Sequence, residues 1–230
     1  MRIEGVNENT CIVYFGDSIC DETAGLVKQA TDNIRATLSD VITDLVPSYT
    51  SVMICYDLER IDRFGIHTRL RQALESGAAK AQDDAAAQTL ELPVYYGPEV
   101  ALDLKDVCEF SGLSADEVIR IHSEQTYRVY AIGFSPGFAF LGSTDQRIAM
   151  PRKSTPRLKV PVGSVGIAGS QTAIYPSATP GGWQIVGRTP SKMVDWDSES
   201  LALAQIGDRI KFRSIDREEF IRLGGQFDEL

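Results

Sequence analysis

Residues 133–190 read GFSPGFAFLGSTDQRIAMPRKSTPRLKVPVGSVGIAGSQTAIYPSATPGGWQIVGRTP. Glycine and proline interrupt short apolar runs at close intervals, and no apolar periodicity of helix length separates these runs. The runs are Ala139 to Leu141, Val165 to Ala168, Thr172 to Tyr175 and Trp183 to Val186, and Arg209 to Phe212 continues the pattern towards the C-terminus. Many short strands joined by turns predict a closed or nearly closed β-barrel, because closure removes unpaired strand edges.

Two short helices are expected within the same domain, ahead of residue 133. The expected elements are a strand at 92–96, a helix at 103–111, a helix ending near His122 and a strand at 126–134. Gly112 suits the left-handed conformation that ends a helix. Ser114 and Glu117 have the spacing of a capping box at the start of the second helix.

The first third of the chain has a different pattern. Strands are expected at 11–15, 41–46 and 50–56, and helices at 21–38 and 61–74. This order predicts a two-layer α+β domain with both helices on one face of a mainly antiparallel sheet. Residues 76–88 contain no large apolar side chain, so we place the domain boundary there, with an α+β domain at 1–88 and the barrel at 89–230.

The composition excludes several classes of protein. The chain has 230 residues, 43% of them hydrophobic and 24% charged, which is typical of a folded globular protein. A net charge of −9 argues against general nucleic-acid binding, which needs many cations to neutralise phosphates. No apolar run has the length of a membrane span, and the first residues lack the pattern of a secretory signal, so we expect a cytoplasmic protein. The four cysteines form no C-x-x-C pair and are expected to be reduced and mostly buried.

The sign of the charge reverses in residues 133–190. The segment contains six cationic side chains and a single acidic one, Asp145. Its net charge is therefore +5, and that of the remainder of the chain is −14. A cluster of cations raises the potential that a carboxylate or phosphate feels, which indicates a site for a small anion. A solvated basic face without a ligand is the alternative.

The candidate binding residues lie in this basic segment. Prolines on both sides of Arg152 and Arg157 prevent a helix and hold the backbone extended. Fixed guanidinium groups suit a carboxylate or a phosphate. The other candidates are Gln171, Thr172, Tyr175, Trp183 and Arg188. We expect these residues to form a pocket for a small anionic amide or carboxylate. Tyr175 and Trp183 would fit the barrel core equally well.

Few residues are available for catalysis. Residues 133–137 satisfy the pattern G-x-S-x-G, but Pro136 has no N–H to donate to an oxyanion, so we interpret the motif as a tight turn. The sequence has two histidines, too few for a multi-histidine metal site, and none of the common glycine-rich nucleotide motifs. We expect no metal ligands on this chain. His122 can face the barrel mouth as a proton shuttle, or it can interact with a helix dipole.

Three segments resemble the KipI, or allophanate hydrolase subunit 1, family. They are YRVYAIGFSPGFAFLG (127–142), MPRKSTPRLKVPVGSVGIAGSQTAIYP (150–176) and TPGGWQIVGRTP (179–190). The resemblance implies a small α+β domain followed by a cyclophilin-like β-barrel. It also implies a cytosolic component of a 5-oxoprolinase complex, which acts with the A and C subunits in ATP-dependent opening of 5-oxo-L-proline to L-glutamate.

This resemblance sets the functional expectations. ATP and Mg²⁺ would be shared with a partner subunit. His122 and Arg152 are the candidate catalytic residues, and the candidates for substrate binding are Arg157, Gln171, Thr172, Tyr175, Trp183 and Arg188. Two alternatives are a non-catalytic regulator that inhibits a histidine kinase and a subunit for allophanate or urea-type amide metabolism.

Overall fold

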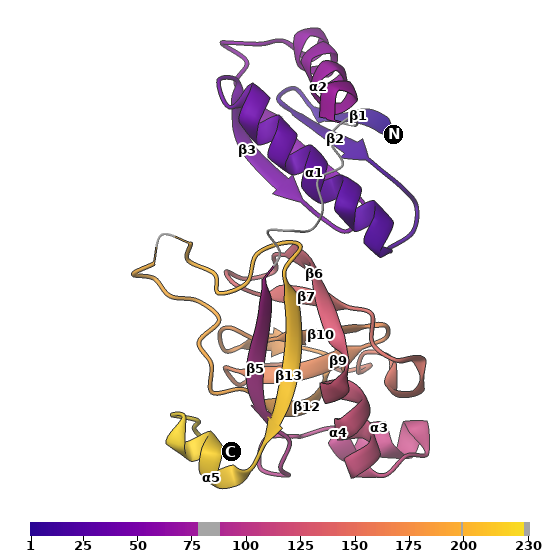
Figure 1. Ribbon diagram of the computed structural model, residues 1–230, viewed down its shortest axis with the longest axis vertical. Coiled ribbons are helices and arrows are strands. Elements are labelled where there is room, and N and C mark those ends of the chain that lie inside the picture. The colour runs from indigo at the N-terminus through magenta and orange to yellow at the C-terminus, as the bar shows by residue number, and fades with distance from the viewer. Residues whose placement is uncertain (78–87, 199, 228–230) are drawn as a thin grey trace. The chain divides into compact units, whose positions relative to one another are not determined.

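The computed structural model describes residues 1–77, 88–198 and 200–227. The chain divides into two compact units, Met1–Ala87 and Gln88–Leu230 (Figure 1). Most of the predicted linker at 76–88 lies outside the described residues. Within the described ranges, no helix has both the length and the apolar character needed to cross a membrane.

The N-terminal unit is a four-stranded sheet with two helices. Its elements are β1 (Arg2–Asn7), β2 (Thr10–Tyr14), α1 (Asp21–Leu38), β3 (Ile42–Pro47), β4 (Ser51–Tyr56) and α2 (Arg63–Gly77). The strand order is β1-β2-β4-β3, and every neighbouring pair is antiparallel. Val13 and Ile54 on the sheet form one buried cluster with Ile34 of α1 and Ile66 of α2. The predicted two-layer arrangement is therefore confirmed.

Side-chain alternation explains which face of this sheet is covered. In β4, Val52, Ile54 and Tyr56 are buried, while the residues between them are half-buried. Cys55 is one of the residues between, so its thiol points away from the helices. All four cysteines are free, and Cys11 is buried, whereas Cys20, Cys55 and Cys108 are half-buried. The prediction that most of the thiols are buried was wrong.

The C-terminal unit is a closed barrel with short helices. Its elements are β5 (Thr89–Tyr95), α3 (Leu104–Ser111), α4 (Ala115–Glu124), β6 (Thr126–Ile132), β7 (Ala139–Gly142), a 3₁₀ turn (Gln146–Ile148), β8 (Arg157–Val160), β9 (Ser164–Ala168), β10 (Gln171–Ile174), β11 (Thr179–Gly181), β12 (Gln184–Arg188), β13 (Arg209–Ile215) and α5 (Arg217–Arg222). The barrel order is β10-β7-β6-β13-β5-β12-β9, with β11 and β8 paired separately. The predicted closure is confirmed.

The barrel closes between its first and last strands. β5 and β13 run parallel over seven residue pairs, from Thr89 opposite Arg209 to Tyr95 opposite Ile215, and they lie side by side in Figure 1. The other pairs in the barrel are antiparallel. Every strand in the barrel therefore has a neighbour on both sides, which removes exposed strand edges from it.

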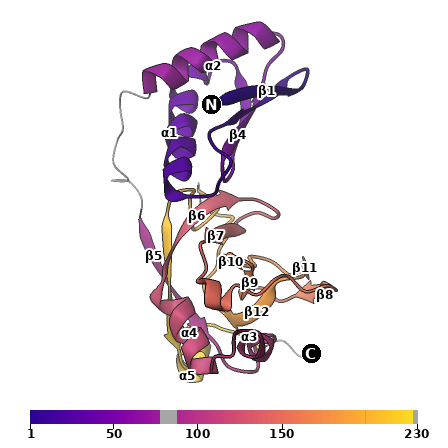
Figure 2. The ribbon, with the colours of Figure 1, turned by 90° about the vertical axis from the view of Figure 1, so that its right-hand side faces the viewer.

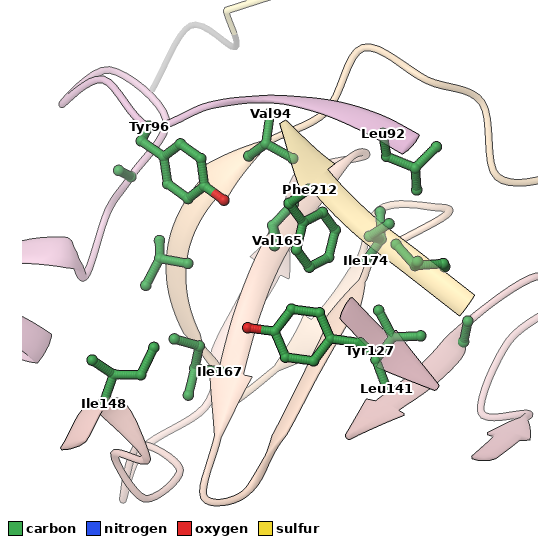
Figure 3. Close-up of a cluster of buried hydrophobic side chains, with 14 of the residues drawn as sticks. Leu92, Val94, Tyr96, Tyr127, Leu141, Ile148, Val165, Ile167, Ile174 and Phe212 are labelled. Carbon is green, nitrogen blue, oxygen red and sulfur yellow. The ribbon is translucent and has the colours of Figure 1, made fainter. Parts of the chain in front are cut away.

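Large side chains from several strands fill the barrel interior. Figure 3 shows Val94, Tyr127, Val165 and Phe212 converging from different strands. The Tyr127 hydroxyl donates to the backbone carbonyl of His122 at 2.9 Å, so its burial leaves no unsatisfied group there.

The helices α3 and α4 lie together at one end of the barrel (Figure 2). Gly112 follows α3 with φ 71°, and its N–H donates to the Cys108 carbonyl. Ser114 and Glu117 form the capping box of α4 in both directions. These local predictions from the sequence are confirmed.

Candidate ligand-binding groove

Asp103, immediately before α3, anchors the basic segment to the barrel. Its carboxylate is 1% exposed and accepts hydrogen bonds from Arg157 Nη1 at 2.7 Å and Nη2 at 2.8 Å, and from Lys153 Nζ at 2.7 Å. The backbone N–H of Ile185 in β12 donates to the same carboxylate at 2.7 Å. Burial raises the pKa of the Asp103 carboxyl, but the hydrogen bonds from Arg157, Lys153 and Ile185 together hold it below its usual value. Asp103 therefore ties residues 153–157 to β12.

This arrangement gives Arg157 a partner within the chain. Both terminal nitrogens of Arg157 are hydrogen-bonded to Asp103, so its guanidinium fork is already occupied. Lys153 contacts Asp106 at 3.4 Å in addition to Asp103. In this structure Arg157 anchors the basic segment to Asp103, and its contact with a substrate stays a prediction.

A groove of about 450 Å³ opens beside this anchor. Its lining consists of Phe110 of α3, Met150, Pro151, Arg152, Lys153, Ser154 and Thr155, and Gln184 of β12. The Phe110 ring is 52% exposed and offers an apolar wall. Arg152 is exposed, and none of the ion pairs found in the described ranges includes it. Of the predicted arginines, Arg152 is therefore the exposed one that lines this groove.

Gln184 contributes to the groove lining from the first position of β12. Its side chain is 2% exposed, and Nε2 donates to the Pro151 carbonyl at 2.8 Å. Oε1 is buried and accepts no hydrogen bond from the described residues. Because the Pro151 carbonyl needs a donor, this orientation of the amide is the favourable one. A buried oxygen without a donor costs about 1–3 kcal/mol. Because Oε1 is closed to solvent, a ligand in the groove would contact other atoms of the lining.

His122 lies inside the barrel unit and has no exposed surface. Tyr96 Oη lies 2.8 Å from Nδ1, and Thr172 Oγ1 lies 2.9 Å from Nε2. The Thr172 hydroxyl donates to the Gly166 carbonyl at 3.0 Å, so its oxygen accepts from Nε2–H. Nδ1 then accepts the Tyr96 hydroxyl proton. The imidazole stacks on Phe212 with a centroid distance of 4.7 Å.

The environment keeps His122 uncharged at neutral pH. Burial lowers the pKa of His122 from its usual 6.5 to about 3. The expectation that it faces the barrel mouth was wrong, because α4 turns it inward with Val118 and Ile121. Thr172, a predicted substrate residue, is buried with it. This placement fits an internal structural role for His122 better than a proton shuttle.

The remaining predicted residues lie at separate places. Tyr175 and Trp183 belong to a buried aromatic cluster, with edge contacts to Phe138 at 5.2 and 5.8 Å, which agrees with the core interpretation. Gln171 is half-buried in β10. Arg188 is 5% exposed at the far end of β12 from Gln184, and its Nη1 donates to the Gln226 carbonyl at 3.0 Å. The predicted pocket is thus divided among the groove, the aromatic core and the end of β12.

The G-x-S-x-G motif forms a turn. The Phe138 N–H donates to the Ser135 carbonyl at 3.0 Å, and the strand β7 follows at Ala139. An elbow that presents a nucleophile would lead into a helix instead. The interpretation of this motif as a turn is confirmed.

The fold places the chain in a class of proteins in which a small α+β unit is joined to a mixed β-barrel. A family model for the carboxyltransferase domain, subdomains C and D, matches residues 1–204. The chain belongs to this family, which confirms the relationship indicated by the sequence motifs.

Individual relatives extend this result. The chain is 36% identical over 227 residues to the B subunit of 5-oxoprolinase from Bacillus subtilis, covering 95% of both chains. It is 45% identical over 129 residues to the 5-oxoprolinase B subunit of Haemophilus influenzae, which covers 56% of this chain and 61% of the relative. The crystal structure of TTHA0988 matches with a TM-score of 0.80 and 30% identity over 90% of this chain. This chain spans 40% of the TTHA0988 chain.

Proposed function

We propose that this chain is the B subunit of an ATP-dependent 5-oxoprolinase, acting with the A and C subunits of that enzyme to convert 5-oxo-L-proline to L-glutamate. The observation that carries the proposal is the relationship to the B subunit of Bacillus subtilis, which extends over 95% of both chains. A match of this length extends across both units of the chain.

The chemistry of the groove is consistent with this role. 5-Oxo-L-proline is a five-membered lactam with a carboxylate, and its amide bond is stable enough to need activation before water attacks. Arg152 offers a cation for an anion, and Phe110 offers an apolar wall. This chain would bind and orient the substrate, while ATP supplies the activation of the amide in the complex.

The described residues offer no preformed cluster of metal ligands. In the part of the chain that the structure describes, no three His, Cys, Asp or Glu side chains gather in an arrangement that can hold a metal. The sequence also lacks the common glycine-rich phosphate-binding motifs. We therefore assign this chain no step that passes through Mg²⁺ or ATP.

Reconstitution tests the proposed function. The purified chain is combined with its A and C partner subunits, and phosphate release is measured with and without 5-oxo-L-proline. We expect hydrolysis of ATP that depends on 5-oxo-L-proline and on the presence of this chain, accompanied by L-glutamate. A complex that assembles but hydrolyses ATP at the same rate without 5-oxo-L-proline contradicts the proposal.

A further inference from the structure

The sheet of the N-terminal unit has two edge strands, β1 and β3, and β3 is protected against pairing with another chain. The register with β4 points the backbone groups of Leu45 and Pro47 away from the sheet. The Leu45 N–H donates to the Asp44 carboxylate of the same strand at 2.8 Å, and Pro47 has no N–H. At both positions β3 therefore offers no donor to a neighbouring strand, which is a common way to close a sheet edge.

The opposite edge, β1, lacks this protection. Among the described strands it pairs with β2 alone, and five of its six residues are exposed. The Phe15 N–H donates to the Thr50 carbonyl at 2.8 Å, so the odd-numbered residues of β2 bond to β4. Backbone direction alternates along a strand, and the even-numbered residues of β2 therefore bond to the even-numbered residues of β1. The N–H and C=O groups of Ile3 and Gly5 are left pointing away from the sheet.

We propose that β1 is a dimerisation edge, to which a second copy of this chain adds its own β1 in the antiparallel direction. The two copies then share a continuous sheet of eight strands, four from each copy. The two-fold axis passes between Ile3 of one copy and Ile3 of the other. In this register the outward backbone groups of the two Ile3 residues form a hydrogen-bonded pair.

The charges of β1 favour this register. Arg2 and Glu4 lie 3.2 Å apart with side chains that are 64% and 47% exposed, on the face of the sheet opposite to Ile3. An antiparallel pair centred on Ile3 places Arg2 of each copy opposite Glu4 of the other, which adds two ion pairs between the copies. An axis at Glu4 would place like charges opposite each other, and an axis at Gly5 would place Glu4 opposite Val6. Charged edge strands usually repel one another, but the order of signs in β1 attracts a second copy.

The other face of β1 offers apolar contacts. Ile3 packs against the buried cluster of the unit and is itself half-buried, so Ile3 of the second copy can cover its exposed part. Met1, which is 66% exposed, comes to lie opposite Gly5 of the other copy. Gly5 has no side chain to fill this place, and it lines a groove of about 620 Å³ whose apolar residues are the exposed Val6 and Leu58. The Met1 side chain of one copy therefore has apolar surface to pack against on the other.

Sedimentation velocity of the full-length chain tests the dimer. One pair of strands makes a small interface, so we expect association over about 10 to 100 μM. Arg2→Glu places like charges opposite each other on both sides of the axis and should weaken the dimer by about tenfold or more. Glu4→Arg should have the same effect with the opposite sign. The chain that carries both substitutions regains two pairs of opposite charge and should dimerise like the parent.

Arg120→Glu is the matched control for charge reversal. Arg120 is an exposed arginine of α4 that lies 3.0 Å from Glu124, so its reversal breaks a comparable ion pair in the other unit. This substitution should leave the dimer unchanged. Circular dichroism checks that each variant is folded.

Cysteine cross-linking tests the register. Opposite residues in a hydrogen-bonded antiparallel pair have Cα atoms about 5.5 Å apart, which is within the range of a disulfide. Ile3→Cys should therefore give a covalent dimer under mild oxidation. Asn7→Cys should not, because eight residues along the strand direction separate the two positions by about 25 Å. The parent chain, which has four free cysteines of its own, gives the background.

The outcomes decide the proposal directly. A parent chain that stays monomeric up to about 100 μM overturns it. A dimer that both single reversals leave intact also overturns it, because such a dimer forms elsewhere, and so does cross-linking of Asn7→Cys as fast as Ile3→Cys. Dimerisation that each reversal weakens and the double substitution restores supports it. These measurements use this chain alone, so their result is independent of whether the reconstituted complex acts on 5-oxo-L-proline.

Discussion

The burial of His122 predicts a specific dependence of barrel stability on pH. The unfolded histidine titrates near pH 6.5, whereas in the folded barrel its pKa is about 3. Between these values the unfolded chain binds a proton that the folded chain does not. The stabilisation is therefore complete above pH 6.5 and is lost as the pH falls towards 3. Lowering the pH from 7 to 5 should remove about 2 kcal/mol of unfolding free energy through this one group.

Urea unfolding followed by tryptophan fluorescence measures this effect. Both tryptophans, Trp183 and Trp196, lie in the barrel unit, so the signal reports on that unit. His122→Gln should lower the stability at pH 7 and also reduce its dependence on pH by about 1 kcal/mol per unit between pH 5 and 6. The carboxylates titrate in both proteins, so the difference between them isolates the histidine.

His67 provides the matched control for this experiment. It is the other histidine of the sequence and lies in α2 of the N-terminal unit. His67→Gln should leave the barrel transition and its pH dependence unchanged. A His122→Gln barrel that keeps the full pH dependence of the parent refutes the reasoning.

Two further predictions concern the anchor and the turns of the barrel. Asp103→Asn should destabilise the barrel by about 3 kcal/mol in the same urea assay, because Arg157 and Lys153 lose their shared carboxylate. Asp106→Asn, which removes one exposed contact at 3.4 Å, is the control, and equal effects of the two substitutions would contradict the anchor. Gly169→Ala should cost about 1 kcal/mol, because Gly169 has φ +59° in open space. Gly163→Ala should cost clearly more, because φ is +77° and its Cβ would lie 2.4 Å from the Thr189 carbonyl oxygen; equal thermal midpoints for the two alanine variants would contradict this steric account.

Local signals explain which parts of the fold the sequence could predict. The capping box of Ser114 and Glu117 and the left-handed Gly112 depend on residues a few positions apart, and both are present. β1 (Arg2–Asn7) was not predicted, because it is an almost fully exposed edge strand without an apolar alternation. The helix α5 (Arg217–Arg222) was also missed, since a single buried residue, Phe220, gives it no apolar stripe.

The candidate site depends on contacts between distant residues, which the sequence does not display. Arg157 was correctly placed in an extended basic segment, but its partner Asp103 lies 54 positions earlier. In the sequence, Asp103 reads as an ordinary residue at the start of a helix. The sequence could predict that Arg152 contacts an anion. It could not predict the place of Gln184 in the groove, because that place depends on the hydrogen bond from Gln184 to the distant Pro151 carbonyl.

The parallel pairing of β5 and β13 has a consequence for the order of synthesis. The N-terminal unit has all four of its strands and both of its helices once residue 77 has been made, so it can fold while the rest of the chain is still being translated. The barrel cannot close before β13 leaves the ribosome, because its last strand completes the ring against its first. Until then β5 and β6 each lack a neighbour, and the nascent barrel presents open strand edges to other chains. A stop codon before residue 209 would therefore leave a folded α+β unit attached to an aggregation-prone remainder, with consequences well beyond the loss of one strand.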